Sequence, residues 1–306
     1  MSSGRFWMLG AEDPEMQAIE RLLRECGETV GYATVGGKRV HPGNAYQSEG
    51  VEGFAEWPTH FIECELVNTS PYWDLVNTGA LPQPASFDHH RPGDYGFGRG
   101  PAQFLSASSV GQVVAFLCSA SALPWQYLKS ASRPQGFHLA DEWIVSNGSA
   151  VALVPAGLLM TAAADHCLAA ALQGKCPGVD ANDFADWRAA TCGYADILPE
   201  VSAWLAGAPT VSIGGADVAD LRGRVLTLAA LRCMADLACS RGVAYLATPP
   251  AREGERPKVV LGGCGEGTVP GVEPVKAFLS EWATAQGLVE PYGDPVRGFA
   301  GSYLAQ

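Results

Sequence analysis

The sequence predicts an α/β fold: a mostly parallel sheet with helices on both faces, followed by a smaller C-terminal α/β domain. Short apolar runs typical of buried strands alternate with longer segments whose apolar residues recur at helical spacing. This alternation is typical of parallel sheets, because each helix returns the chain to the start of the next strand. Composition changes around residues 206–209, so we expect domains at 1–178 and 210–306, joined by a helical linker at 179–209.

The first predicted unit is a strand followed by a helix. Residues 6–10 form a short apolar run, and the next segment has apolar residues at helical spacing up to Gly27. Asp13 directly precedes Pro14, and this pair is typical of a helix N-cap and the first helical position. Asp13 and Glu15 also lie between a strand and a helix, where open α/β sheets bind ligands. The position of Asp13 is therefore compatible with a capping role and with a ligand role.

Two further strands are expected at 28–34 and 59–67. The second carries two acids, Glu63 and Glu65, within an apolar run. Burial of an unpaired carboxylate is costly or shifts its pKa. We therefore expect either that one of these acids points at solvent or that one of them faces a cation.

An acid and two imidazoles stand together at Asp88, His89 and His90, after an apolar approach and before a Pro-Gly turn. Oxygen and nitrogen donors grouped in this way are typical of a metal site. A surface turn with solvated histidines has the same composition, so the three residues alone do not decide between the two interpretations.

The segment after this triad contains a glycine-rich loop at 93–100 and a helical pattern at 110–117. The loop does not join a strand to a helix at the spacing of a dinucleotide fingerprint, so that kind of site is not predicted. A strand or turn is expected at 143–154. An apolar helix is expected at 155–171, and its acid Asp165 needs a partner.

The C-terminal domain is expected to open with a strand at 210–213 and a long helix at 217–241. The remaining elements are strands at 243–248 and 258–261, a glycine-rich loop at 262–267, a helix at 272–286 and a turn-rich tail.

Composition restricts the partners and the location. The 306 residues carry a net charge of −12, which disfavours long duplex DNA, because phosphate neutralisation supplies most of the affinity of non-specific DNA binders. A small phosphorylated substrate remains compatible, since a bound metal neutralises its charge locally. No apolar run reaches the ~18 residues of a membrane helix and the N-terminus does not resemble a secretory signal, so we expect no membrane partner and a cytoplasmic location.

The nine cysteines include no C-x-x-C pair, which favours reduced thiols over a disulfide framework. The sequence does not indicate the oligomeric state.

Acids follow or end the predicted strands at 13–15, 63–65 and 88, and Asp165 adds a fourth position. Parallel strands present their carboxyl ends to one edge of a sheet, so these acids are expected to converge. Carboxylates gathered at one edge repel one another unless cations lie between them. The sequence therefore predicts one or two divalent metal ions at this edge.

This order of motifs resembles the DHH phosphoesterase superfamily, which includes RecJ-type exonucleases, nanoRNases and cyclic-dinucleotide phosphodiesterases. The matching positions are Asp13-Pro14-Glu15 for the first acidic motif, Glu65 or Glu63 for the second, Asp88-His89-His90 for the name-giving motif, and Asp165 after the small residues 162–164 for the fourth. The resemblance covers about residues 6–170. Beyond Gly214 the chain resembles, more weakly, the DHH-associated substrate domain of the family.

The resemblance implies metal-dependent hydrolysis of a phosphodiester or phosphoanhydride bond in a small nucleotide or a short single-stranded oligonucleotide, with a two-metal site for Mn²⁺ or Mg²⁺. In this family's pattern Asp88 bridges the metals, His89 is itself a metal ligand or orients one, and His90 contacts phosphate or donates a proton. The metal ligands that the resemblance implies are Asp13, Glu15, Glu65, Asp88, His89 and Asp165.

Because the chain is so acidic, binding of a substrate phosphate requires positively charged side chains or backbone N–H donors. Arg91 and Arg99 follow the triad and are candidates for a phosphate clamp, or they are solvated loop arginines. The backbone N–H groups of Gly262, Gly263 and Gly265 either approach a phosphate or nucleobase or form a tight turn only.

The chain departs from the family pattern in its first two motifs. No His precedes the first acids, and Glu replaces Asp at position 15 and in the second motif, which lengthens these side chains by one methylene. These changes favour an alternative: a catalytically altered relative that binds a nucleotide or a partner, or one that carries out another metal-dependent nucleotide modification.

Overall fold

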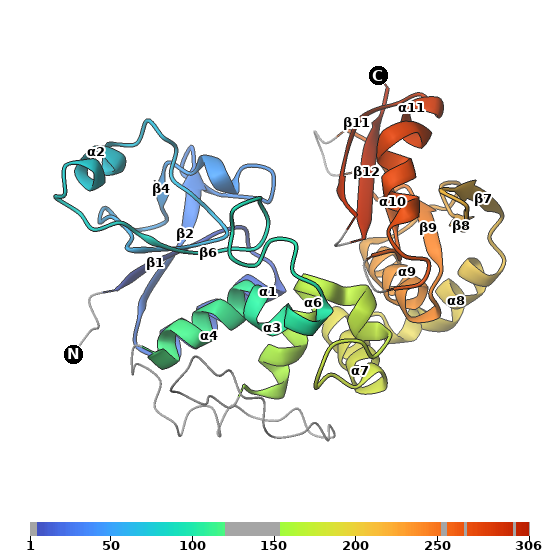
Figure 1. The fold of residues 1–306 in the computed structure, drawn as a ribbon, viewed down its shortest axis with the longest axis horizontal. Helices are drawn as coiled ribbons and strands as arrows, with labels where there is room; N and C mark the ends of the chain where they lie inside the picture. Colours follow the sequence, from blue (N-terminus) through green and yellow to red (C-terminus); the bar gives the residue numbers. More distant parts are fainter. Residues whose placement is uncertain (1–4, 120–153, 252–255, 266–267, 296–297, 306) are drawn as a thin grey trace. The chain divides into compact units, whose positions relative to one another are not determined.

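The computed structural model describes residues 5–119, 154–251, 256–265, 268–295 and 298–305 (Figure 1). The strand or turn expected at 143–154 lies outside them, apart from Val154. The chain divides into two compact units at Asp165, with residues 166–306 in the second unit and most of the preceding chain in the first. Helices and two sheets occur in the described residues, which confirms the α/β class.

The first unit is built on a sheet with strand order β3-β2-β1-β5-β6. Strand β1 pairs in parallel with β2 and β5, and β5 pairs in parallel with β6, whereas β3 and β4 add to β2 in antiparallel fashion. The elements of this unit are β1 (Phe6–Leu9), α1 (Pro14–Glu25), β2 (Thr29–Val35), β3 (Lys38–Arg39), η1 (Ala45–Gln47), β4 (Gly50–Val51), β5 (His60–Ile62), α2 (Pro71–Asn77), β6 (Ala85–Phe87), α3 (Phe104–Ala107), α4 (Ser109–Ser119) and the first part of α6 (Ala156–Leu172); the short η2 (Pro101–Gln103) precedes α3.

Helices lie on both sides of this sheet, α2 on one and α1 and α4 on the other (Figure 1). Because side chains alternate along a strand, β1 divides its residues between the two faces. Met8 joins the core that includes Tyr72 of α2. Trp7 packs edge-on against Phe116 of α4, with the ring centroids 5.6 Å apart. Both faces of β1 are therefore buried, as the apolar run of the sequence predicts for a central parallel strand.

The register of the parallel strands aligns their carboxyl ends. Leu9 pairs with Ile62, and Ile62 pairs with Phe87, so each of the three strands ends at the same level. The next residues continue the alignment, because Glu63 N donates to Phe87 O over 3.2 Å. Asp88 directly follows Phe87. Glu63 and Asp88 are thus set side by side at one edge of the sheet by strand register alone.

Helix α4 fits against α3 only because position 111 is a glycine. A Cβ atom built on Gly111 would lie 1.6 Å from Leu105 O. We expect Gly111→Ala to lower the free energy of unfolding by about 1–3 kcal/mol or more, as overpacking of a filled site does. Chemical denaturation measures this loss. The matched control is Gly157→Ala in α6, where the added Cβ meets nothing within 4 Å. That change is expected to be neutral or to stabilise by up to about 1 kcal/mol, and equal effects of both substitutions would contradict the packing account.

The second unit contains a sheet with order β11-β12-β10-β9-β8-β7, in which β8 and β9 are parallel and the other pairs antiparallel. Its described elements, besides the end of α6, are α7 (Ala181–Cys192), η3 (Ala195–Ile197), α8 (Leu198–Ala206), β7 (Thr210–Ile213), β8 (Ala216–Asp220), α9 (Leu228–Arg241), β9 (Ala244–Ala247), β10 (Lys258–Gly262), α10 (Glu273–Ala277), η4 (Phe278–Trp282), α11 (Ala283–Ala285), β11 (Leu288–Asp294) and β12 (Phe299–Leu304).

The second unit differs from the sequence-based expectation in three places. The segment 179–209 is helical, as expected, but its Val201 and Leu205 share a core cluster with Met234 of α9, so it packs into the second unit instead of forming a separate linker. The long helix expected at 217–241 is wrong in its first half, because Ala216–Asp220 pairs with β7 and β9 as a strand. The tail expected to be turn-rich forms the antiparallel pair β11 and β12.

The spacing of apolar residues explains why the segment 217–241 was expected to be one long helix. Val218 and Leu221 are three residues apart, as on one face of a helix. In the structure, however, they belong to two different core clusters.

Among the described residues, no helix has both the length and the apolar character needed to cross a bilayer.

Candidate metal centre

Four side chains from four different elements meet at the carboxyl edge of the first sheet. Glu15 comes from the first turn of α1, Glu63 follows β5, His89 follows β6, and Asp165 lies in α6. Each offers one donor atom, and these atoms all lie within 4.8 Å of one another. We call these four residues the acidic cluster. Three carboxylates and one imidazole at this spacing are a donor set suited to a divalent cation.

Glu15 is almost completely buried, with 1% of its surface exposed. One of its oxygens, Oε1, accepts a hydrogen bond of 2.9 Å from Val110 N at the start of α4. The other oxygen, Oε2, is buried and accepts no hydrogen bond from the described residues. An ionised carboxylate oxygen without a donor is costly in the protein interior, so this atom needs a proton or a cation.

Glu63 shows the same features together with an unusual backbone. Its side chain is buried, and Oε1 accepts no hydrogen bond from the described residues. Its φ of 51° lies in the left-handed region, which non-glycine residues seldom adopt. Such a backbone costs of order 1–3 kcal/mol and is concentrated at functional sites. The conformation places the Glu63 carboxylate within 3.7 Å of His89 Nδ1.

His89 connects the strand ends to α6. Its side chain is fully buried, and Nε2 lies 2.8 Å from Asp165 Oδ2. Its other ring nitrogen, Nδ1, lies 3.1 Å from Ser109 Oγ. In a metal site one imidazole nitrogen binds the ion and the other is held by a hydrogen bond. The Ser109 contact at Nδ1 orients the ring in this way, and Nε2 faces Asp165 of the cluster.

Two carboxylates of the acidic cluster, Glu15 and Glu63, have raised pKa values. Burial raises the pKa of Glu15 well above 4.5, and the charges of Asp165 and Glu63 raise it further. The pKa of Glu63 is raised by burial and by Asp165, against the opposing effect of the two histidines. Asp13, at the rim of the cluster, has its pKa raised to about 7 by burial and by the charges of Glu63 and Asp165. Mutually repelling, desolvated acids of this kind either hold protons or bind a cation.

Asp88 has a different environment from the acids of the cluster. Its Oδ1 accepts hydrogen bonds from the backbone N–H groups of His89 and His90, at 2.7 and 3.0 Å. Its Oδ2 accepts a hydrogen bond of 2.8 Å from the Tyr46 hydroxyl. Burial opposes ionisation of Asp88, but the hydrogen bonds from His90 and Tyr46 outweigh it and hold its pKa below 3.8. Asp88 thus stabilises the turn that presents the two histidines.

A second set of donors overlaps the first. Glu63, His89 and His90 also bring three donor atoms within 4.8 Å of one another. His90 Nδ1 lies 3.0 Å from Asp88 Oδ1 and 3.9 Å from Glu63 Oε2. With 30% of its side chain exposed, His90 is the member of the triad that remains accessible to a substrate.

The two acids of the second motif lie in different environments. Glu63 lies in the acidic cluster, whereas Glu65 forms a 3.0 Å ion pair with Arg91. The Arg91 guanidinium also lies over the Tyr46 ring, 3.8 Å from its centroid. Arg91 is thus close to Asp88 through Tyr46, but its charge is already shared with Glu65.

Two other predicted site residues have local roles. Asp13 caps α1, because Oδ1 accepts a 2.7 Å hydrogen bond from Met16 N, and the charges of Glu63 and Asp165 add to the rise in its pKa. Arg99 donates to Tyr95 O over 2.8 Å within the glycine-rich loop.

The glycines of the predicted substrate loop belong to the second unit. A Cβ atom on Gly263 would lie 2.3 Å from Val243 O, and one on Gly262 would lie 2.7 Å from the Tyr245 hydroxyl. Gly265 N donates to Gly271 O over 3.0 Å. Close packing and a tight turn therefore account for these glycines, and Glu266 and Gly267 lie outside the described residues.

Some contributors to the centre were not predicted from the sequence. Tyr46 and Gln112 both support the triad: Tyr46 bonds Asp88, and Gln112 Nε2 donates to Asp88 O over 2.9 Å. Tyr46 has no local sequence signal, because it lies in the short η1 segment, 42 residues before Asp88 in the sequence. Gln112 lies on the helix that the sequence predicts directly after the glycine-rich loop, so its proximity could have been inferred.

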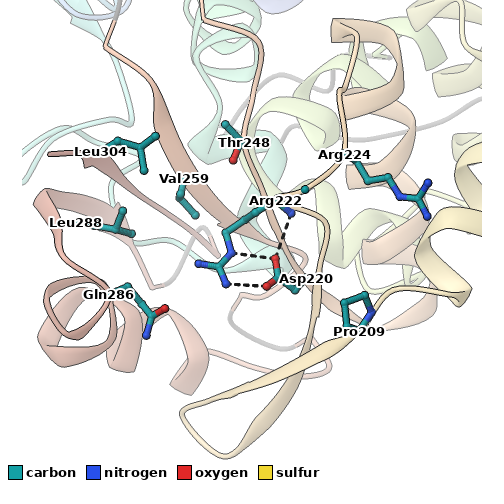
Figure 2. Close-up of a pocket in the computed structure, with 10 residues that line it drawn as sticks. Pro209, Asp220, Arg222, Arg224, Thr248, Val259, Gln286, Leu288 and Leu304 are labelled. Carbon is teal, nitrogen blue, oxygen red and sulfur yellow. Dashed lines mark hydrogen bonds and ion pairs between the residues drawn. The ribbon is translucent and has the colours of Figure 1, made fainter. Parts of the chain in front are cut away.

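A separate pocket of about 620 Å³ occurs in the second unit (Figure 2). Figure 2 shows the Arg222 side chain beside Asp220, and Arg222 Nε and Nη2 donate to the two Asp220 oxygens over 2.9 and 2.7 Å. Val259, Leu288 and Leu304 form an apolar part of the lining. Because Asp220 neutralises Arg222, the pocket offers no surplus positive charge from this pair.

Comparison with known proteins adds no assignment: no protein-family model, curated protein or solved structure matches the chain.

Proposed function

We propose that the protein is a divalent-metal-dependent hydrolase of phosphodiester or phosphoanhydride bonds in a small nucleotide or a short single-stranded oligonucleotide. The observation that carries the proposal is the acidic cluster, in which Glu15, Glu63 and Asp165 meet around His89. The resemblance of the motif order to the DHH phosphoesterase superfamily supports the same function. The proposal places the centre on a mostly parallel sheet, in a cytoplasmic protein, and treats the second unit as a substrate-binding domain.

The donor set fits a divalent cation on two grounds. Buried oxygens of Glu15 and Glu63 accept no hydrogen bond from the described residues, so they are available as ligands. The mixture of carboxylate oxygens with imidazole suits Mn²⁺ better than Mg²⁺, which favours oxygen alone. Mn²⁺ bound here would activate water and neutralise phosphate charge. The second donor set shares Glu63 and His89 with the first, so a two-metal site would use these two residues in common.

The other residues of the centre have roles as positioning and contact groups. Asp88 is proposed to hold the His89–His90 turn through its three hydrogen-bonded N–H and O–H partners. His90, held by Asp88 and partly exposed, is placed to contact phosphate or to give a proton to a leaving oxygen. Arg91 reaches a phosphate once the phosphate displaces Glu65 from its guanidinium.

The test is hydrolysis of a substrate panel by the purified chain with Mn²⁺: pyrophosphate, linear dinucleotides, cyclic dinucleotides and short single strands. We expect turnover of at least one class and a loss of about 100-fold or more in Asp165→Asn, which keeps the size of the side chain but removes its charge. The control is Asp186→Asn, an exposed acid on α7. Equal turnover by Asp165→Asn and the wild type would refute the assignment.

A second candidate is a relative that binds a nucleotide without hydrolysing it or carries out another metal-dependent modification of a nucleotide. The environment of Asp88 favours this alternative, because both of its oxygens already accept hydrogen bonds and a bridging role between two ions would have to displace some of them. Binding of a panel nucleotide that depends on Mn²⁺ but gives no turnover would support the second candidate over the first.

A further inference from the structure

Two cysteines outside the acidic cluster lie unusually close together. Cys167 Sγ and Cys176 Sγ are 2.9 Å apart. A disulfide bond has an S–S length of about 2.0 Å, so the two sulfur atoms need to approach by only about 0.9 Å to form one. Cys176 is buried, whereas Cys167 is partly exposed. The pair therefore combines near-bonding geometry with access for a small reagent.

The local fold explains this proximity. Helix α6 is kinked at Cys167, whose φ of −152° and ψ of 50° are not helical. The helix ends at Leu172. Beyond it, Gly174 takes a left-handed φ of 68°, and Lys175 N donates to Ala170 O over 2.9 Å. This reversal of the chain brings Cys176 back alongside the kink. The contact thus depends on two backbone features that both hold the sulfur atoms together.

We propose that Cys167 and Cys176 form a redox-modification site that closes to an intramolecular disulfide on reaction with a small-molecule disulfide such as oxidised glutathione. Cys167, the more exposed thiol, loses its proton and attacks one sulfur of the reagent, which forms a mixed disulfide and releases one thiol. Cys176 then loses its proton and attacks the Cys167 sulfur of the mixed disulfide. The second thiol of the reagent leaves as the Cys167–Cys176 bond forms. The two cysteines give up two electrons and two protons, and both end on the two released thiols.

The position of the pair gives the disulfide a structural consequence. Asp165 precedes Cys167 by two residues on α6, and the first compact unit ends at Asp165. The bond ties the kink to the segment that follows the helix. Oxidation therefore fixes the backbone directly after one residue of the acidic cluster and at the point where the chain enters the second unit.

The experiment treats the full-length reduced protein with oxidised glutathione, blocks remaining thiols by alkylation, and maps the products by mass spectrometry after trypsin digestion. Cleavage after Lys175 separates the two cysteines, so the disulfide appears as a pair of linked peptides. We expect this linkage in the wild type and its reversal by reduced glutathione. In Cys176→Ser we expect Cys167 to keep a bound glutathione, because no second cysteine resolves the mixed disulfide.

The control is Cys192→Ser, which removes another partly exposed thiol of the second unit and is expected to leave the linkage unchanged. Two results would overturn the proposal. One is alkylation of both Cys167 and Cys176 after treatment, while other thiols take up glutathione. The other is wild-type Cys167 that retains glutathione to the same extent as in Cys176→Ser. No metal is needed in this experiment, so its result is independent of the proposed hydrolase activity.

Discussion

Replacement of Glu15 by Gln is expected to weaken Mn²⁺ binding by roughly 100-fold or more, and at the same time to stabilise the metal-free protein. The affinity falls because the cluster loses a carboxylate ligand, and the loss should at least match that of an outer-shell partner, which is 10–100-fold. The metal-free protein gains because burial, together with the charges of Asp165 and Glu63, disfavours the ionised form of Glu15, and Gln has no such form. Gln retains an oxygen that can accept the Val110 N–H bond, so the packing of α1 against α4 is kept.

Two measurements on the same samples check this prediction. Calorimetric titration gives the affinity for Mn²⁺, and thermal unfolding with and without Mn²⁺ gives the change in Tm that binding produces. In Glu15→Gln the metal-free Tm should rise and the increase caused by Mn²⁺ should disappear. The matched control is Glu25→Gln, which removes the same charge from an exposed position at the end of α1. A Glu15→Gln variant that binds Mn²⁺ as tightly as Glu25→Gln would contradict the role of Glu15 as a ligand.

The second large effect is expected from pH. In the metal-free folded protein Asp13 has a pKa of about 7 against 3.8 for the free side chain, and the pKa values of Glu15 and Glu63 are also raised. The folded state therefore binds more protons than the unfolded state between about pH 4 and pH 7. The contribution of these groups to stability is present at low pH and is lost as pH rises through the folded-state pKa. Mn²⁺ reverses this trend, because it competes with the same protons, and its affinity rises by about tenfold per pH unit for each proton released.

Thermal unfolding at about pH 5.5 and about pH 7.5, with chelator and with Mn²⁺, measures both trends. The metal-free protein should have the lower Tm at the higher pH, and the stabilisation by Mn²⁺ should be larger there. Asp13→Asn is the diagnostic variant, since Asn remains a good N-cap for Met16 N but cannot titrate. Its metal-free Tm should depend less on pH than that of the wild type. A metal-free Tm of the wild type that rises from about pH 5.5 to about pH 7.5, while that of Asp13→Asn does not, would contradict this prediction.

Much of the first unit could be predicted from the sequence, because its elements are local and strongly patterned. The apolar run of β1 and the Asp13-Pro14 helix start follow from short-range signals. The convergence of acids follows from the parallel register of the strands. This register aligns Glu63 and Asp88 at one edge of the sheet without any contact between distant side chains.

Other features depend on tertiary contacts that periodicity does not encode. The different environments of Glu63 and Glu65 depend on a left-handed backbone at Glu63 and on the ion pair between Glu65 and Arg91. The alternation of apolar and polar residues along the segment 59–67 reveals neither this backbone conformation nor this ion pair. Asp88 was expected among the metal ligands, but its oxygens accept hydrogen bonds from the backbone of the turn and from Tyr46, which is distant in the sequence. In the second unit, β8 resembles the start of a helix until its pairing with β7 and β9 is known.

The account depends above all on a cation between Glu15, Glu63, His89 and Asp165. Anomalous diffraction at the manganese edge from crystals soaked with Mn²⁺ tests this directly. The account predicts an anomalous peak within coordination distance of these four side chains, and its loss in crystals of Glu15→Gln. A fully soaked crystal with no peak at the acidic cluster, or with manganese bound only elsewhere on the chain, would contradict it.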